Sequence, residues 1–236
     1  MKWDDIQTRA LKDGMLVYAL DQGQTAQAKV MGRSFEDGKF VDVREPGPWG
    51  RSQGGYCSGL SARWIALHYV GADYPYDPVT HECEAPDWQA TRDHNLQVDD
   101  HEKGFPGKYK RVLAQYGLTM NKGSLRYFKG FQPSALVQAV NDFRGCMLLS
   151  MWGKDGGHGT AIGRRPEYKA AWFFFDPNYG EFTFPGATEA RRFLEGFFID
   201  TGYRNQFTAS GVVGVNAPPY VLGDLKELTR LGWKLE

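Results

Sequence analysis

Three residues of the chain have the types and the order along the sequence that nucleophilic catalysis by a thiol requires. Cys57 follows Gly54 and Gly55 closely and stands at the start of a helical pattern. The unpaired N–H groups and the dipole at a helix start favour a thiolate over a thiol, so a cysteine there tends to be a nucleophile. His158 lies among glycines, and Asp176 ends an aromatic run. A cysteine, a histidine and an aspartate in this chain order predict a catalytic triad.

The spacing of His158 and Asp176 predicts that the two side chains meet at one end of a β-hairpin. Short apolar runs at 160–163 and 171–175 lie between them, separated by a proline-containing turn. Antiparallel pairing places the start of one strand beside the end of the next. The carboxylate would then fix the imidazole tautomer, and the imidazole would deprotonate Cys57 and later protonate a leaving amine.

Such a reaction also needs hydrogen-bond donors for the oxyanion that forms on the substrate. The backbone N–H of Cys57 is one expected donor, because it lies at the start of the predicted helix. The side chain of Gln53, just upstream, is the candidate for the second donor. Arg51 and Ser52 remain alternatives to Gln53.

The elements that must position these residues are predicted from apolar periodicity. Leu60, Trp64 and Leu67 recur at helical spacing and predict a helix over 58–70 that buries one stripe. Pro133 and Gly145 bracket a second helix. Further helices are expected at 107–116, 187–198 and near 224–231, and strands of an antiparallel meander at 146–152, 160–163, 171–175 and 181–184. The fold class is therefore α+β, with a helical N-terminal part followed by an antiparallel sheet.

Two regions are expected along the chain. Residues 1–50 read as an N-terminal extension that packs on the core, and residues 51–236 as the catalytic domain. A chain of 236 residues with 42% hydrophobic and 14% aromatic content is long and apolar enough for one packed core. The first 30 residues lack the apolar core of a cleaved secretory signal, and no apolar run is long enough to span a bilayer.

The charges of the chain balance overall but separate along the sequence. The formal net charge is zero, which predicts neither a nucleic-acid nor a membrane partner. Residues 71–104 hold nine acids and two bases, whereas residues 105–132 hold six bases and no acid. Either the two segments neutralise each other on the surface, or one of them lines a charged substrate groove.

The remaining cysteines and histidines do not indicate a metal centre or a disulfide framework. Three cysteines without close pairing favour a reducing compartment. His81, Cys83, His94 and His101 fit no standard zinc spacing, so no metal and no cofactor is expected. Cys146 reads as an ordinary cysteine in an apolar strand.

The pattern resembles the YopT/AvrPphB-type papain-fold cysteine proteases, which are bacterial effectors. The resemblance runs from about residue 50 to 200 and rests on Cys57 followed by Leu60, Ser61 and Trp64, on Gly157-His158-Gly159, and on Phe175-Asp176-Pro177-Asn178-Tyr179-Gly180. It implies a papain-like fold, a triad of Cys57, His158 and Asp176, and cleavage of a protein in a host or target cell. It also implies delivery by a specialised bacterial secretion system, with a secretion chaperone or an immunity protein as a further partner.

Two other classes of function are compatible with part of the same sequence pattern. A deamidase, transglutaminase-like enzyme, acyltransferase or peptidoglycan amidase would use the same thiolate, imidazole and oxyanion donors on another bond or acceptor. A non-catalytic binding protein would retain the frame and bind through the charged surface of residues 71–132.

Overall fold

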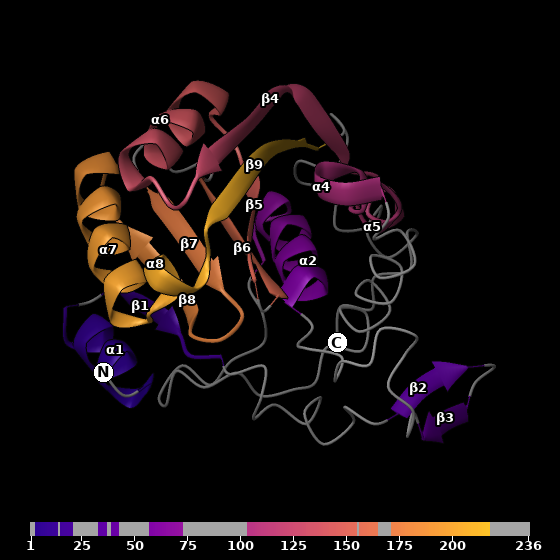
Figure 1. The fold of residues 1–236 in the computed structure, drawn as a ribbon, viewed down its shortest axis with the longest axis horizontal. Coiled ribbons are helices and arrows are strands. Elements are labelled where there is room, and N and C mark those ends of the chain that lie inside the picture. Colours follow the sequence, from indigo (N-terminus) through magenta and orange to yellow (C-terminus); the bar gives the residue numbers. More distant parts are fainter. Residues whose placement is uncertain are drawn as a thin grey trace.

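The computed structural model describes residues 3–13, 15–20, 33–36, 39–42, 57–72, 103–154, 156–164 and 171–217. Within these residues, an antiparallel sheet of seven strands has the order β1-β8-β7-β6-β5-β9-β4 (Figure 1). Its strands are β1 (Leu16–Tyr18), β4 (Thr119–Lys129), β5 (Met147–Gly153), β6 (Gly156–Arg164), β7 (Trp172–Asp176), β8 (Gly180–Phe184) and β9 (Ala209–Asn216). A separate hairpin consists of β2 (Arg33–Glu36) and β3 (Lys39–Asp42).

Helices cover both faces of this sheet (Figure 1). One face packs against α2 (Cys57–Tyr69) and α5 (Lys110–Gln115), with α4 (Gly104–Gly107) beside them. The other face packs against α6 (Pro133–Phe143) and α7 (Ala187–Asp200), and α1 (Trp3–Lys12) and α8 (Tyr203–Gln206) extend that layer. The papain-like arrangement of helix and antiparallel sheet expected from the sequence is confirmed.

The two-sided cover explains why the central strands are continuously apolar. Successive side chains of a strand point to opposite faces of the sheet. Phe173 and Phe175 accordingly join the core on the α2 side, whereas Phe174 joins the core on the α7 side. All three are buried, so a polar residue at any of them would lie in a packed core rather than in water.

The meander β5-β6-β7-β8 agrees with the sequence prediction, although one of its strands begins earlier than expected and other elements differ from the prediction. Strand β6 begins at Gly156 rather than at 160, so His158 lies inside the strand and not at its start. The helix expected over 107–116 is broken into α4 and α5. Strands β4 and β9 were not anticipated, and β9 lies between β5 and β4. The helix expected near 224–231 lies outside the described residues.

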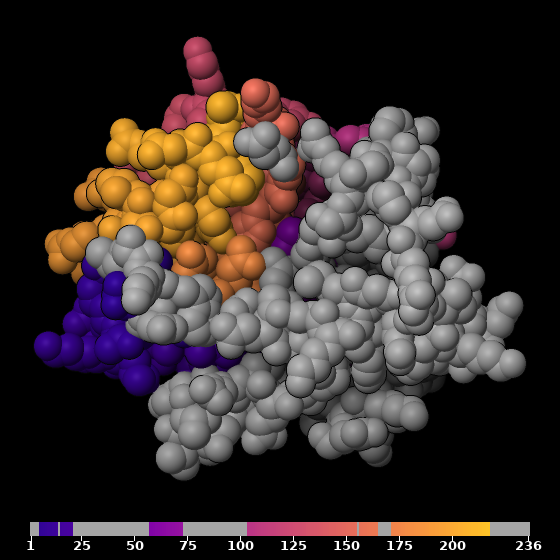
Figure 2. Space-filling view, turned by 60° about the horizontal axis from the view of Figure 1, so that its bottom comes forward, coloured from indigo at the N-terminus to yellow at the C-terminus, as the bar shows by residue number. Residues whose placement is uncertain are grey.

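The first 20 residues contribute to the main sheet and its core. β1 pairs with β8 and extends the sheet on that side. Ile6 is buried, and the Gln7 side chain donates a hydrogen bond of 2.7 Å to the carbonyl of Tyr179. Arg9 forms an ion pair with Asp200 at the end of α7. Figure 2 shows the indigo N-terminal segment lying against the orange part of the molecule.

Candidate active site

The thiol of Cys57 lies at the first residue of α2, where the helix meets the sheet. No acidic residue occurs in the first turn, so the positive end of the helix dipole is not offset there. Further along α2, the Trp64 indole N–H donates a buried hydrogen bond of 2.7 Å to Glu181 in β8. This bond and the apolar stripe of α2 fix the helix on the sheet, and with it the position of the sulfur.

Gly159 in β6 allows the start of α2 to approach the sheet closely. Its backbone N–H donates a hydrogen bond to Cys57 Sγ at 3.3 Å, and its carbonyl accepts one from Ser61 Oγ at 3.0 Å. A Cβ at this position would lie 3.1 to 3.3 Å from Tyr109 and Ser58. The glycine therefore provides both a donor to the sulfur and the space that the helix occupies.

His158 and Asp176 form a buried pair across β6 and β7. Nε2 of His158 lies 3.0 and 3.1 Å from the two carboxylate oxygens of Asp176. Because a carboxylate only accepts hydrogen bonds, Nε2 carries the hydrogen, and Nδ1 is the nitrogen left to exchange a proton with the thiol. The backbone N–H of Asn178 donates a second hydrogen bond to Asp176 Oδ1, at 2.8 Å, and holds the carboxylate in place.

The charges at the site favour a thiolate beside an imidazolium. Burial alone raises the pKa of Cys57, but the hydrogen bond and charge of His158, the Gly159 N–H and the Lys108 charge together lower that pKa below 9.0. Burial acts to lower the pKa of His158, but Asp176 and the Cys57 sulfur outweigh it and raise the pKa to about 10. The thiol therefore loses its proton at a lower pH than the imidazole does.

A phenol that the sequence analysis did not identify completes the surroundings of His158. The Tyr203 hydroxyl lies 3.3 Å from His158 Nε2 and accepts a hydrogen bond of 2.8 Å from the Asn178 side chain. Burial, and then the nearby Asp176 charge, raise the pKa of Tyr203, so the phenol stays neutral. The ring of Phe207 lies nearly parallel to the imidazole, at 6.4 Å between ring centroids, and is itself 5.4 Å from the Tyr203 ring. No motif marks Tyr203, because it comes from α8, 45 residues after His158.

The structure thus brings Cys57, His158 and Asp176 together, and their catalytic roles remain a prediction. Gln53, the second oxyanion donor expected from the sequence, lies outside the described residues, as do Arg51 and Ser52. His81, Cys83, His94 and His101 also lie outside them. Cys146 is fully buried in the core on the α2 side.

The described residues contain neither a cluster of metal-binding side chains nor a helix that could span a membrane. No three side chains of the types that bind metals lie close enough together there to hold an ion. In that same part of the chain, none of the helices has the length and apolar character needed to cross a membrane.

Comparison with a solved structure supports the fold. The crystal structure of the Pseudomonas avirulence protein AvrPphB is similar with a TM-score of 0.55, over 70% of this chain and 93% of that one, at 18% sequence identity. At this identity the likeness concerns the fold. No curated protein matches the chain in sequence.

Comparison with protein families supports more than the fold. The model of the peptidase C58 family, described as Yersinia/Haemophilus virulence surface antigen, matches residues 22–211. The match includes the start of α2 with Cys57, and β6 and β7 with His158 and Asp176. The chain therefore belongs to the peptidase C58 family, the YopT/AvrPphB type of papain-fold cysteine protease.

Proposed function

We propose that the chain is a cysteine protease that cleaves a protein of a host or target cell through Cys57, His158 and Asp176. The observation that carries the proposal is the continuous chain of contacts from the sulfur to the carboxylate. The Cys57 sulfur accepts a hydrogen bond from the Gly159 N–H, the neighbouring residue His158 lowers the pKa of the thiol, and Nε2 of His158 lies 3.0 Å from Asp176. Family membership supports the same chemistry.

In the first half of the reaction, the Cys57 thiolate attacks the carbonyl carbon of the scissile peptide bond. The negative charge moves to the carbonyl oxygen, for which the Cys57 N–H at the start of α2 is a donor and Gln53 the candidate for a second. The imidazolium of His158 gives its Nδ1 proton to the leaving amine. The C–N bond breaks, and a thioester with Cys57 remains.

In the second half, water replaces the amine. His158 takes a proton from water, the resulting hydroxide attacks the thioester carbonyl, and the thiolate leaves. Asp176 does not take up the proton; it orients the ring and stabilises the imidazolium in both halves. The buried position of the His158–Asp176 pair keeps this ion pair out of water.

The target and the route of delivery are inferred from the relatives. The family model describes a virulence surface antigen, and AvrPphB is an avirulence protein. These names support an effector that reaches the cytoplasm of a host or target cell through a specialised bacterial secretion system. A secretion chaperone or an immunity protein is then a further expected partner.

The test is a search for new protein N-termini in a lysate of target cells. The lysate is treated with the wild-type chain, with Cys57→Ala, and with Cys146→Ala as a matched control that also removes one sulfur. We expect new N-termini with the wild type and with Cys146→Ala, and none with Cys57→Ala.

Two results would contradict the proposal. Cleavage retained in Cys57→Ala would exclude this thiol as the nucleophile. A gain of about 1 Da at glutamine side chains, without new N-termini, would identify a deamidase that uses the same residues.

A further inference from the structure

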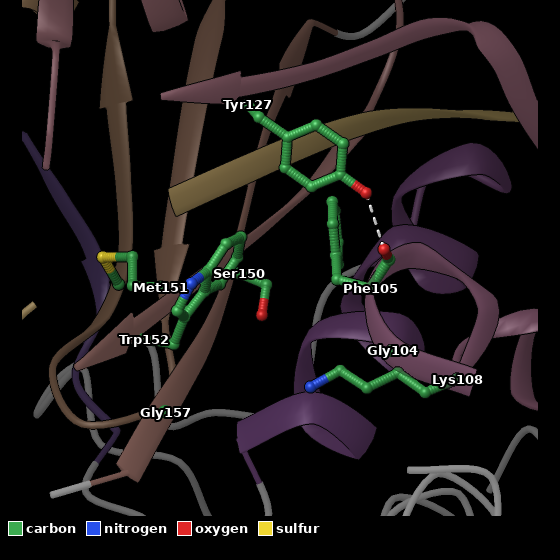
Figure 3. A pocket seen from close by; sticks show the side chains of 8 residues that line it. All are labelled: Gly104, Phe105, Lys108, Tyr127, Ser150, Met151, Trp152 and Gly157. Atoms are coloured by element: carbon green, nitrogen blue, oxygen red, sulfur yellow. Dashed lines mark hydrogen bonds between the residues drawn. The ribbon is translucent and has the colours of Figure 1, made fainter. Parts of the chain in front are cut away.

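A pocket of about 290 Å³ lies directly beside the candidate active site (Figure 3). Its floor is the end of β5, which pairs with the part of β6 that carries His158. The register places Ser150 opposite Gly159 and Trp152 opposite Gly157. Directly opposite residues in a sheet are neighbours at about 5 Å. A substrate whose scissile peptide bond lies at the Cys57 thiol can therefore place a neighbouring side chain in this pocket.

Three aromatic rings from different elements form the walls of the pocket. Phe105 of α4, Tyr127 of β4 and Trp152 of β5 lie with ring centroids 6.1 to 6.4 Å apart. The Tyr127 hydroxyl donates a hydrogen bond of 2.7 Å to the carbonyl of Phe105, drawn as a dashed line in Figure 3. A Cβ on Gly211 would lie 2.8 Å from the Phe105 ring, so the ring fits only because Gly211 has no side chain. The Phe105 ring is thus held by packing, and Tyr127, which is 57% exposed, by its hydrogen bond.

Two hydrogen-bond donors from different elements enter the same pocket. Figure 3 shows the Ser150 hydroxyl and the Lys108 ammonium pointing into the space beside the rings. Ser150 is 4% exposed, and its hydroxyl makes no hydrogen bond within the part of the chain that the structure describes. Lys108 forms no ion pair with any described residue, and its ammonium lies 5.4 Å from the centroid of the Tyr109 ring.

The surroundings of the pocket carry the same sign of charge as Lys108. Among the residues that the structure describes, no Asp or Glu lines the pocket. From Lys103 to Gln132, which includes α4, α5 and β4, the chain contains seven basic residues and no acidic one. Such a segment attracts anions to the groove that it borders. Lys108 brings this basic segment to the pocket, which favours the alternative that the segment lines a charged substrate groove.

We propose that this pocket binds an acidic side chain of the substrate, close to the scissile bond. The aliphatic stem of that side chain would lie along Phe105 and Trp152, and its carboxylate would accept hydrogen bonds from Lys108 Nζ and Ser150 Oγ. An apolar occupant would cover the ammonium and the hydroxyl without giving them a partner, which is unfavourable. This inference rests on the proposed function, since it names the substrate preference of the same site.

The test compares pairs of alkylating peptides that are identical except at one position, where one peptide has Glu and the other has Gln. Peptidyl chloromethyl ketones and N-chloroacetyl peptides present side chains on either side of the thiol and lose chloride when the Cys57 sulfur bonds to their methylene carbon. The second-order rate of Cys57 modification is read from the intact mass. At one position we expect Glu to react about five- to tenfold faster than Gln, the size of one partly desolvated ion pair.

Variants then assign that preference to the pocket. Lys108→Gln is expected to bring the Glu/Gln ratio close to one, and Lys108→Glu to favour a peptide with lysine at that position instead. Ser150→Ala is expected to lower the ratio about two- to threefold. Lys110→Gln, an exposed position in the same basic segment that does not line the pocket, is the control and should leave the ratio unchanged. The ratio cancels any effect of Lys108 on the reactivity of the thiol itself.

The outcomes separate this inference from the proposed function. A Glu/Gln ratio near one at every position, or a ratio that survives Lys108→Gln, overturns the acidic pocket; fast modification of Cys57 would then leave the protease proposal intact. If Cys57 instead reacts no faster than the same thiol in urea-unfolded protein, the catalytic thiol is excluded. The ratio still decides about the pocket in that case.

Discussion

At the scale of single residues, Cys57 and His158 have exchanged the order in which they would titrate in water. The pKa of the thiol lies below 9.0, and that of the imidazole rises from 6.5 to about 10. Between the two values, the sulfur is anionic and the ring is cationic. Because the imidazole pKa is raised, the protonated ring is the stable form at neutral pH and loses its proton only as the pH rises through about 10.

The thiol and the imidazole therefore set different pH limits for alkylation of Cys57 and for peptide cleavage. Alkylation of Cys57 by iodoacetamide needs only the thiolate, so it should stay fast at a lower pH than alkylation of an ordinary cysteine, and it should also stay fast above pH 10. Peptide cleavage needs the imidazolium as well, so it should fall as the pH rises through about 10. Asp176→Asn removes the charge that raises the pKa of His158, so its alkaline limit should move to lower pH. An alkaline limit that does not move would contradict the role given to Asp176.

At the scale of elements, the site depends on how closely the start of α2 approaches β6. The hydrogen bond from the Gly159 N–H to Cys57 Sγ and the bond from Ser61 Oγ to the Gly159 carbonyl join the helix to the strand. The hydroxyls of Ser58 and Tyr109, 3.1 Å apart, occupy the space beside the glycine. A side chain at position 159 would therefore move the sulfur relative to the imidazole.

Gly159→Ala tests this dependence. The added methyl group would lie 3.1 to 3.3 Å from Ser58 and Tyr109, so the helix start or the strand must shift by a few tenths of an ångström. We expect kcat/KM to fall about 10-fold, because a misplacement of about 1 Å can cost about 100-fold and a shift of a few tenths of an ångström costs less. Gly196→Ala in α7 is the matched control, since a Cβ there meets nothing within 4 Å. Equal activity of the two variants would show that the close approach does not matter.

Comparison at the same scale shows which elements a sequence can reveal. The apolar stripe of α2 and the meander β5-β8 are local patterns, and both were predicted. β9 was not, because its glycines interrupt the pattern: Gly211 makes room for Phe105, and Gly214 for Phe143. Its place between β5 and β4 is set by pairings with residues far away along the chain.

The same reason limits what the sequence reveals of the site. Cys57, His158 and Asp176 stand in recognisable local contexts, and these contexts, with the order and spacing of the three residues, predicted that they would lie together. Tyr203 and Lys108 have no such context, since each reaches the site only through the packing of α8 and of the segment next to α5. Lys108 belongs to the basic run of residues 105–132, which is visible in the sequence. The sequence does not show which basic residue of this run faces the site.

At the scale of the whole molecule, residues 3–20 complete the layer opposite α2. Ile6, Ala10 and Leu16 belong to the same core as α6 and α7, and β1 covers the edge of β8. The Gln7 and Arg9 contacts join α1 to both the β7–β8 turn and the end of α7. We infer that this segment is an integral part of the folded domain rather than a removable extension.

Two substitutions on α1 test that inference. Ile6 is 2% exposed and Leu11 is 45% exposed on the same helix, so the pair compares a core position with a surface one. Ile6→Ala should lower the free energy of unfolding by about 2 to 4 kcal/mol in a denaturant titration, because it leaves a cavity in the shared core. Leu11→Ala should change it by less than about 1 kcal/mol. The loss in Ile6→Ala should appear in the single transition that also reports on Trp64 and the sheet, because one core unites the segment with the domain. A separate early transition for α1, with the main transition unchanged, would instead show that the segment docks on an independently stable domain.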